Sequence, residues 1–127
     1  MKTSVIAFIM SLMALVAGAS EKGASIEFEN TKHDFGTIKA NAGSVTATYR
    51  FTNTGSAPLV IITVTNGGCG CTIPSYPKEP IAPGKSGEIQ IHFNPTGRRG
   101  EFNREVKVKT NSSRKREKLS FSGVIIP

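Results

Sequence analysis

The strongest constraint on the fold is an alternation of apolar and polar side chains that repeats every two residues. Between Val45 and Thr52, every second residue is apolar or aromatic, and the residues between them are polar. The same alternation runs through residues 87–93, 102–110 and 118–125. A period of two is typical of strands with one face on a hydrophobic core and one face in water. No window shows a convincing helical period, so the chain is predicted to be all-β.

Three further segments are strand candidates, at residues 26–28, 35–38 and 59–64. The last is dense in β-branched residues, and we expect a strand buried on both faces there. Segments rich in Gly, Pro and Asn separate the candidates; Asn53-Thr54-Gly55 is expected to turn through a residue at positive φ, and Pro83-Gly84 through a type II turn. About seven short strands with such turns predict an antiparallel β-sandwich.

The first residues have the pattern of a secretory signal peptide. Lys2 precedes an apolar run from Val5 to Val16, and Ala17-Gly18-Ala19 offers the small residues that signal peptidase accepts. The run is shorter than the roughly 20 residues of a membrane-spanning helix. We therefore predict a signal peptide at residues 1–19, an exported domain at residues 20–127, and no transmembrane span once the signal is removed.

Cys69 and Cys71 are the only cysteines, with Gly70 between them, and three hypotheses apply to them. An oxidising exported environment favours a disulfide, although closing so small a loop contributes only roughly 1.6 kcal/mol by chain entropy. Alternatively, two thiolates on one face of an extended segment could bind a soft metal such as Cu(I) or Zn(II). The third hypothesis is pairing with a thiol of another protein. In each case Cys69 and Cys71 are the redox or metal candidates.

A metal site would need more ligands, and only His33 and His92 could add imidazole. The two histidines are more simply interpreted as a surface residue and a capping residue. The three methionines all lie in the predicted signal peptide, which argues against a Met-rich copper carrier. No nucleophile elbow, phosphate-binding glycine loop or zinc-protease motif occurs. We predict no catalytic residue, no cofactor and no enzyme activity.

Positive charge is concentrated near the C-terminal end of the chain, where nine basic residues face only three glutamates between residues 97 and 118. If these residues share two strands and their hairpin, they form a basic patch for an anionic surface. The simpler interpretation is that they keep an edge strand soluble. Nucleic acid is not an expected partner, because export and the lack of an aromatic platform argue against it. The patch comprises Arg98, Arg99, Arg104, Lys107, Lys109, Arg114, Lys115, Arg116 and Lys118.

The order of short motifs resembles a bacterial domain-of-unknown-function family of exported, Ig-like proteins with a CGCT motif. The motifs are His33-Asp34-Phe35-Gly36-Thr37-Ile38, Phe51-Thr52-Asn53-Thr54-Gly55, Pro58-Leu59-Val60-Ile61, Cys69-Gly70-Cys71-Thr72, Pro80-Ile81-Ala82-Pro83-Gly84 and Ile89-Gln90-Ile91-His92-Phe93. That family is similar to Hydin-type (ASH) and major-sperm-protein-like domains. The resemblance covers about residues 26–125 and implies an Ig-like sandwich in a bacterial cell envelope.

These observations predict a non-catalytic, exported Ig-like module with an interaction or structural role in the envelope. Its expected partner is a protein or an envelope polymer, reached through an unpaired sheet edge or the basic face. Its expected location is the periplasm or the cell surface. The alternative is a thiol redox or soft-metal (copper or zinc) handling protein that uses Cys69-Gly70-Cys71.

Overall fold

Eight β-strands make up the regular structure of the chain in a computed structural model that describes residues 22–113 and 116–127. No helix occurs in these residues, so the all-β prediction is confirmed. The signal peptide predicted at residues 1–19, and Arg114 and Lys115 of the predicted patch, lie outside the described residues. The strands are β1 (Ile26–Phe28), β2 (Lys32–Lys39), β3 (Val45–Asn53), β4 (Ile61–Val64), β5 (Thr72–Ser75), β6 (Ser86–Phe93), β7 (Gly100–Thr110) and β8 (Glu117–Ile126).

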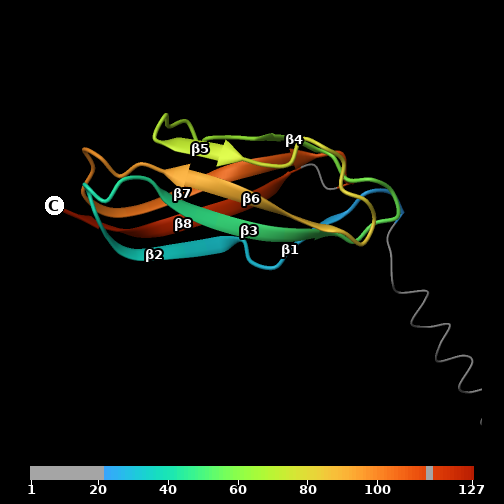
Figure 1. Ribbon diagram of the computed structural model, residues 1–127, viewed down its shortest axis with the longest axis horizontal. Helices are drawn as coiled ribbons and strands as arrows, with labels where there is room; N and C mark the ends of the chain where they lie inside the picture. The colour runs from blue at the N-terminus through green and yellow to red at the C-terminus, as the bar shows by residue number, and fades with distance from the viewer. Residues whose placement is uncertain (1–21, 114–115) are drawn as a thin grey trace, which may run out of the picture.

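The strands form two four-stranded sheets that face each other as a sandwich (Figure 1). One sheet has the order β1-β3-β6-β5 and the other has the order β2-β8-β7-β4. All neighbouring strands are antiparallel except β2 and β8, which are parallel. The sandwich is therefore antiparallel in its main part, with one parallel pair at an edge.

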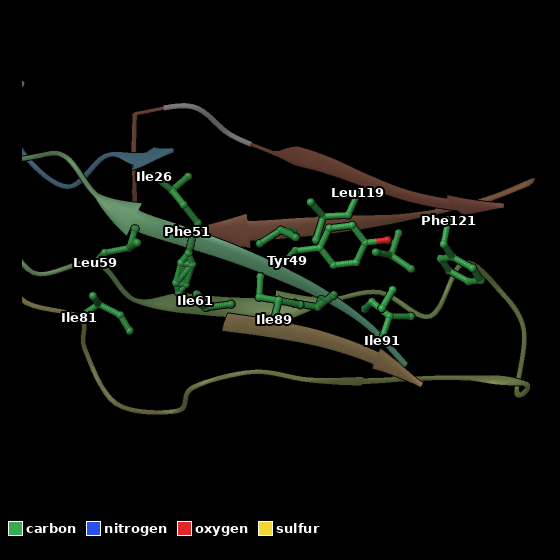
Figure 2. Packing of buried hydrophobic residues seen from close by; sticks show 14 of the residues in the cluster. Ile26, Tyr49, Phe51, Leu59, Ile61, Ile81, Ile89, Ile91, Leu119 and Phe121 are labelled. Carbon is green, nitrogen blue, oxygen red and sulfur yellow. The ribbon is translucent and has the colours of Figure 1, made fainter. Parts of the chain in front are cut away.

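The hydrophobic core lies between the sheets, where the alternating apolar residues meet (Figure 2). Tyr49 and Phe51 of β3 and Ile89 and Ile91 of β6 are almost fully buried, as the period of two predicts. Three phenylalanines form an aromatic cluster, with ring centroids 4.9–6.3 Å apart: Phe93, Phe102 and Phe121. Packing of both inner faces is thus what holds the two layers together.

Asn53 is a buried polar residue that ties three loops together at one end of the core. Its side-chain oxygen accepts bonds from the amides of Ser25 and Gly55, and its Nδ2 donates to the carbonyl oxygens of Ala57 and Ile81. The expectation of a positive φ between Asn53 and Gly55 is wrong, because neither residue has one. Gly55 is instead required because a Cβ there would collide with the backbone of residues 23–25.

Two segments near the middle of the chain differ from the sequence expectations. The predicted doubly buried strand at residues 59–64 is instead the short edge strand β4, in which Ile62 is 50% exposed. The sequence does not predict β5, because Pro74 interrupts it and no alternation is visible. Proline is tolerated there since β5 is an edge strand.

The type II turn predicted at Pro83-Gly84 is confirmed, with Gly84 at φ +80° and the Lys85 amide bonded to the Ala82 carbonyl oxygen at 3.0 Å.

Candidate functional site

The two cysteines lie in a segment that crosses from one sheet to the other, between edge strands β4 and β5. At its start, the Thr65 amide donates to the Lys107 carbonyl oxygen of β7 at 2.9 Å. At its end, the Cys71 carbonyl oxygen accepts from the Asn94 amide just after β6, also at 2.9 Å. Both ends are thus fixed to strands of the sandwich, one on each sheet.

The backbone between these ends is shaped by Asn66, Gly67 and Gly68. The Asn66 side-chain oxygen accepts a 2.9 Å bond from the Gly68 amide, and both glycines have positive φ. A Cβ on Gly67 would stand 2.8 Å from the Glu105 carbonyl oxygen of β7. Glycine is therefore required at position 67 by both its backbone angle and its close contact with β7.

Cys69 and Cys71 are joined by a disulfide, with their Cα atoms 5.2 Å apart. Both residues are half-buried, and Cys71 packs against the hydrophobic core with part of its surface left in solvent. The disulfide is the first of the three hypotheses for these cysteines. Because the sulfurs are bonded to each other, metal binding or pairing with a thiol of another protein would first require this bond to be opened.

The two sulfur atoms have different surroundings. Cys69 Sγ accepts a bond from Arg98 Nη2 at 3.1 Å and another from the Cys71 backbone amide at 3.2 Å. Among the described residues, the polar neighbour of Cys71 Sγ is the hydroxyl Oγ1 of Thr72, at 3.6 Å. A cation and an aligned N–H both stabilise a thiolate, so Cys69 is the sulfur at which negative charge is best accommodated.

The histidines do not join the cysteines in a ligand cluster. His92 Nδ1 is 2.9 Å from Thr46 Oγ1 of the neighbouring strand, and the His33 ring packs on Phe35 with centroids 4.5 Å apart. Among residues 22–113 and 116–127, no three His, Cys, Asp or Glu side chains are grouped to hold a metal ion. The described side chains thus supply two sulfurs and no third ligand.

Six of the basic residues that the structure describes lie in two different places. Lys107, Lys109 and Lys118 are exposed on the outward face of β7 and β8, with Lys107 directly opposite Lys118. Side chains alternate between the two faces of β7, so Arg104 lies on the same face as the buried Val106 and not on the face of these lysines. The basic residues that the structure describes are therefore not all on one outward face.

Arg98, Arg99 and Arg104 instead line a groove of about 590 Å³, which we call the arginine groove. Phe102, whose ring stacks on Phe93, and Gly67 of the cysteine-bearing segment also line it. Glu101 and Glu105 of β7 are also among the residues that line it. Since Arg98 also contacts Cys69, the groove and the disulfide are adjacent.

The contact between Arg98 and Cys69 was missed by sequence reasoning. It arises because β5 and β6 form an antiparallel pair in which Thr72 faces Phe93, so the residues after Phe93 return beside Cys71. A turn, closed by the Arg98 amide and the Pro95 carbonyl oxygen at 3.0 Å, then brings Arg98 back toward Cys69. The Pro95-Thr96-Gly97 turn was visible in the sequence, but without β5 it could not be placed beside the cysteines.

Several solved structures share this fold at low sequence identity. A protein of unknown function from Porphyromonas gingivalis aligns with a TM-score of 0.70 and 17% identity, covering 86% of this chain and 50% of that one. The VesB protease of Vibrio cholerae aligns with a TM-score of 0.59 and 10% identity, covering 94% of this chain and 35% of that one. An MSP family member from C. elegans aligns with a TM-score of 0.50 and 9% identity, covering 80% of this chain and 97% of that one. The chain thus spans half or less of the first two proteins, and these likenesses describe the fold alone.

Sequence comparisons give one family and no individual relative. No curated protein matches the sequence. A family model described as a protein of unknown function, DUF1573, matches residues 26–125.

Proposed function

The chain belongs to the DUF1573 family of proteins of unknown function, and from that starting point we propose that it is a non-catalytic, exported interaction module of the cell envelope. Its partner is an extended segment of another envelope protein, which adds as a strand to the open edge of β7. The observation that carries the proposal is this unpaired edge, which lies beside the arginine groove.

The open edge follows from how β7 is paired. β7 pairs with β8 from Gly100 to Val108, but its other side pairs with β4 only from Val108 to Thr110. Lys107 directs both its amide and its carbonyl toward Thr65 on the β4 side. Because these directions alternate along a strand, the amides and carbonyls of Glu101 and Asn103 point to the same side, where no strand among the described residues pairs with them. Such an edge can pair with an extended peptide.

The arginine groove gives this edge a chemical preference. Glu101 and Asn103, whose backbone groups face the open side, are among the residues that line it, and so is Glu105, whose carbonyl oxygen is covered by Gly67. Phe102 offers an apolar contact, and the three arginines outnumber the two glutamates. We expect a partner segment that pairs through its backbone and carries an apolar side chain and at least one carboxylate.

A membrane-spanning helix is not found among the described residues, since none there has the required length and hydrophobicity. The export part of the proposal rests on the signal pattern at residues 1–19. N-terminal sequencing of protein recovered from the envelope fraction should begin at Ser20. Recovery of the chain only in the cytosol with Met1 or Lys2 at its N-terminus would contradict export.

The strand-addition mode is tested by two substitutions at one position. Asn103→Pro removes the amide that faces the open edge, whereas the β7–β8 bonds run through Phe102 and Arg104 and remain. Asn103→Ala changes the same side chain and keeps the amide, so it is the matched control. Immobilised domain (residues 20–127) should capture the same envelope protein as wild type when it carries Asn103→Ala.

With Asn103→Pro, capture of that protein should weaken at least about tenfold, as the loss of one backbone bond and a steric clash at the edge require. Thermal unfolding of both variants checks that the fold is kept. Equal capture by all three proteins would contradict strand addition at β7, and turnover of any substrate by the purified domain would contradict the non-catalytic assignment.

A further inference from the structure

We propose that the Cys69–Cys71 disulfide exchanges with a dithiol of an exported partner protein, with Cys71 Sγ as the atom attacked and Cys69 Sγ as the leaving thiolate. This activity is separate from strand addition at β7 and does not depend on it. It assigns a direction to a bond whose two sulfurs would otherwise be equivalent.

The direction follows from the donors that surround Cys69 Sγ. Arg98 Nη2 at 3.1 Å brings a permanent positive charge, and the Cys71 amide at 3.2 Å brings a second N–H. Both interactions strengthen as the sulfur gains negative charge. Cys71 Sγ has no such donor pair, because its neighbour is the neutral Thr72 hydroxyl at 3.6 Å. A thiol stabilised as its anion leaves faster in exchange, so an attacking thiolate is directed to Cys71.

The surrounding structure allows the bond to open without loss of the fold. The disulfide closes a loop of only three residues, so its removal relaxes very little of the chain. The segment has its own supports, including the Thr65–Lys107 and Cys71–Asn94 backbone bonds and the Asn66–Gly68 bond. Arg98 is exposed, and a backbone bond to Pro95 holds its turn in place. We therefore expect Arg98 to remain beside Cys69 after reduction.

The exchange balances as two displacements. A partner thiolate attacks Cys71 Sγ, the Cys69–Cys71 bond breaks, and its electron pair leaves on Cys69 as the thiolate held by Arg98. The second partner thiol then loses its proton and attacks the partner sulfur of the mixed disulfide, and Cys71 leaves and takes up a proton. The partner dithiol is oxidised by two electrons to a disulfide, and Cys69–Cys71 is reduced by two electrons; the proton of the second partner thiol ends on Cys71, and the proton that the first partner thiol lost on ionising stays in solvent.

The first experiment measures the acidity of the two thiols. The reduced protein is treated with iodoacetamide at a series of pH values, and peptide mass mapping gives the alkylation rate of each cysteine. Cys69 should titrate below the ordinary thiol pKa of about 8.5, and Cys71 should not. Arg98→Ala should lower the thiolate fraction of Cys69 at pH 6 by about tenfold. Arg99→Ala, the adjacent arginine of the same groove, is the control and should leave Cys69 unchanged.

The second experiment begins from the oxidised, folded protein, so it does not depend on the stability of the reduced form. Reduced glutathione is the probe, and the rate of disulfide opening is followed under pseudo-first-order conditions. Arg98→Ala should slow the opening by about three- to tenfold, with Arg99→Ala equal to wild type. The proposal is overturned if Arg98→Ala matches Arg99→Ala in both experiments, or if Cys71 is the more acidic thiol. Neither measurement involves the β7 edge, so each proposal can fail alone.

Discussion

At the scale of single residues, two buried polar side chains join parts of the molecule that are distant in sequence. Asn53 is 0% exposed and bonds to three separate loops. Tyr49 reaches across the core from β3, and its hydroxyl donates to the Ser120 carbonyl oxygen of β8 at 2.6 Å. A buried polar group stabilises a fold only while its bonds are satisfied, so each of these residues makes a strong prediction.

Replacing Asn53 by alanine should lower the free energy of unfolding by about 3–5 kcal/mol, because buried amides and carbonyls lose their partners. Asn111→Ala is the matched control. Asn111 also accepts one backbone bond, from Val60, and donates another, to Pro58, but it is exposed. Its loss should cost about 1 kcal/mol or less. Urea unfolding of both variants makes the comparison, and equal effects would show that burial of Asn53 is not what matters.

Tyr49→Phe should cost about 1 kcal/mol at neutral pH through loss of the bond to Ser120. Burial raises the pKa of Tyr49 well above its ordinary value. Below pH 10, Tyr49 is neutral whether folded or unfolded. Above about pH 10, the unfolded chain loses this proton while the folded one keeps it, so wild-type stability should fall more steeply with pH than that of Tyr49→Phe. Parallel slopes in urea unfolding between pH 9 and 11 would contradict this.

Sequence periodicity identifies Tyr49 as a core residue but says nothing about Asn53. Tyr49 is found because its neighbours at Ala47 and Phe51 share its face, which is a local property. The role of Asn53 depends on Ala57 and on two more distant loops, around residues 25 and 81. A single sequence does not show which loops meet, so it indicates only that Asn53 belongs to a turn.

At the scale of strands, the pairing of β7 with β8 places two lysines directly opposite each other. Lys107 and Lys118 are partners across this pair and both are exposed. Like charges at this position repel, and an opposite-charge pair contributes roughly 0.2–1 kcal/mol. Lys118→Glu should therefore raise the free energy of unfolding by about 0.5 kcal/mol, with the gain shrinking in high salt. Lys22→Glu makes the same charge change in a residue outside the strands; an equal gain there would indicate a net-charge effect.

The strands that the sequence predicts well are those with one buried face. β3, β6, β7 and β8 were all expected from alternation. β4 was assigned the wrong surroundings because its β-branched residues indicate strand propensity and not position in the sheet. The parallel pairing of β2 with β8 was not predicted either. Pairing of strands so far apart in sequence depends on the whole topology, which periodicity does not contain.

At the scale of the whole molecule, packing between the sheets outweighs the covalent link. Replacing both Cys69 and Cys71 by serine should cost less than about 2 kcal/mol, because the closed loop is so short. Phe121→Ala should cost about 3–5 kcal/mol, since its ring packs against both Phe93 and Phe102. Thermal unfolding of the two variants shows whether the disulfide or the packing of Phe121 contributes more to stability. A larger loss for the double serine variant would mean that the disulfide holds the sandwich together.

The candidate site was only half predictable from the sequence. The adjacency of Cys69 and Cys71 in a chain expected to be exported was enough to suggest a disulfide. The difference between the two sulfur atoms could not be predicted, because it depends on Arg98. This residue follows Cys69 by 29 positions and is brought back beside it by the β5–β6 pair. The sequence shows the positive charge of Arg98 but not the sulfur atom that lies beside it.

The position of β8 has a consequence for when the molecule can fold. β8 is the last of the eight strands to leave the ribosome, yet it lies inside its sheet, bonded to β2 on one side and β7 on the other (Figure 1). Until β8 emerges, β2 has no strand to pair with and the β2-β8-β7-β4 sheet lacks its link between β2 and β7. A nascent chain therefore cannot complete the sandwich. Late closure of this kind keeps the polypeptide unfolded during synthesis, which is the state that the export proposed above requires.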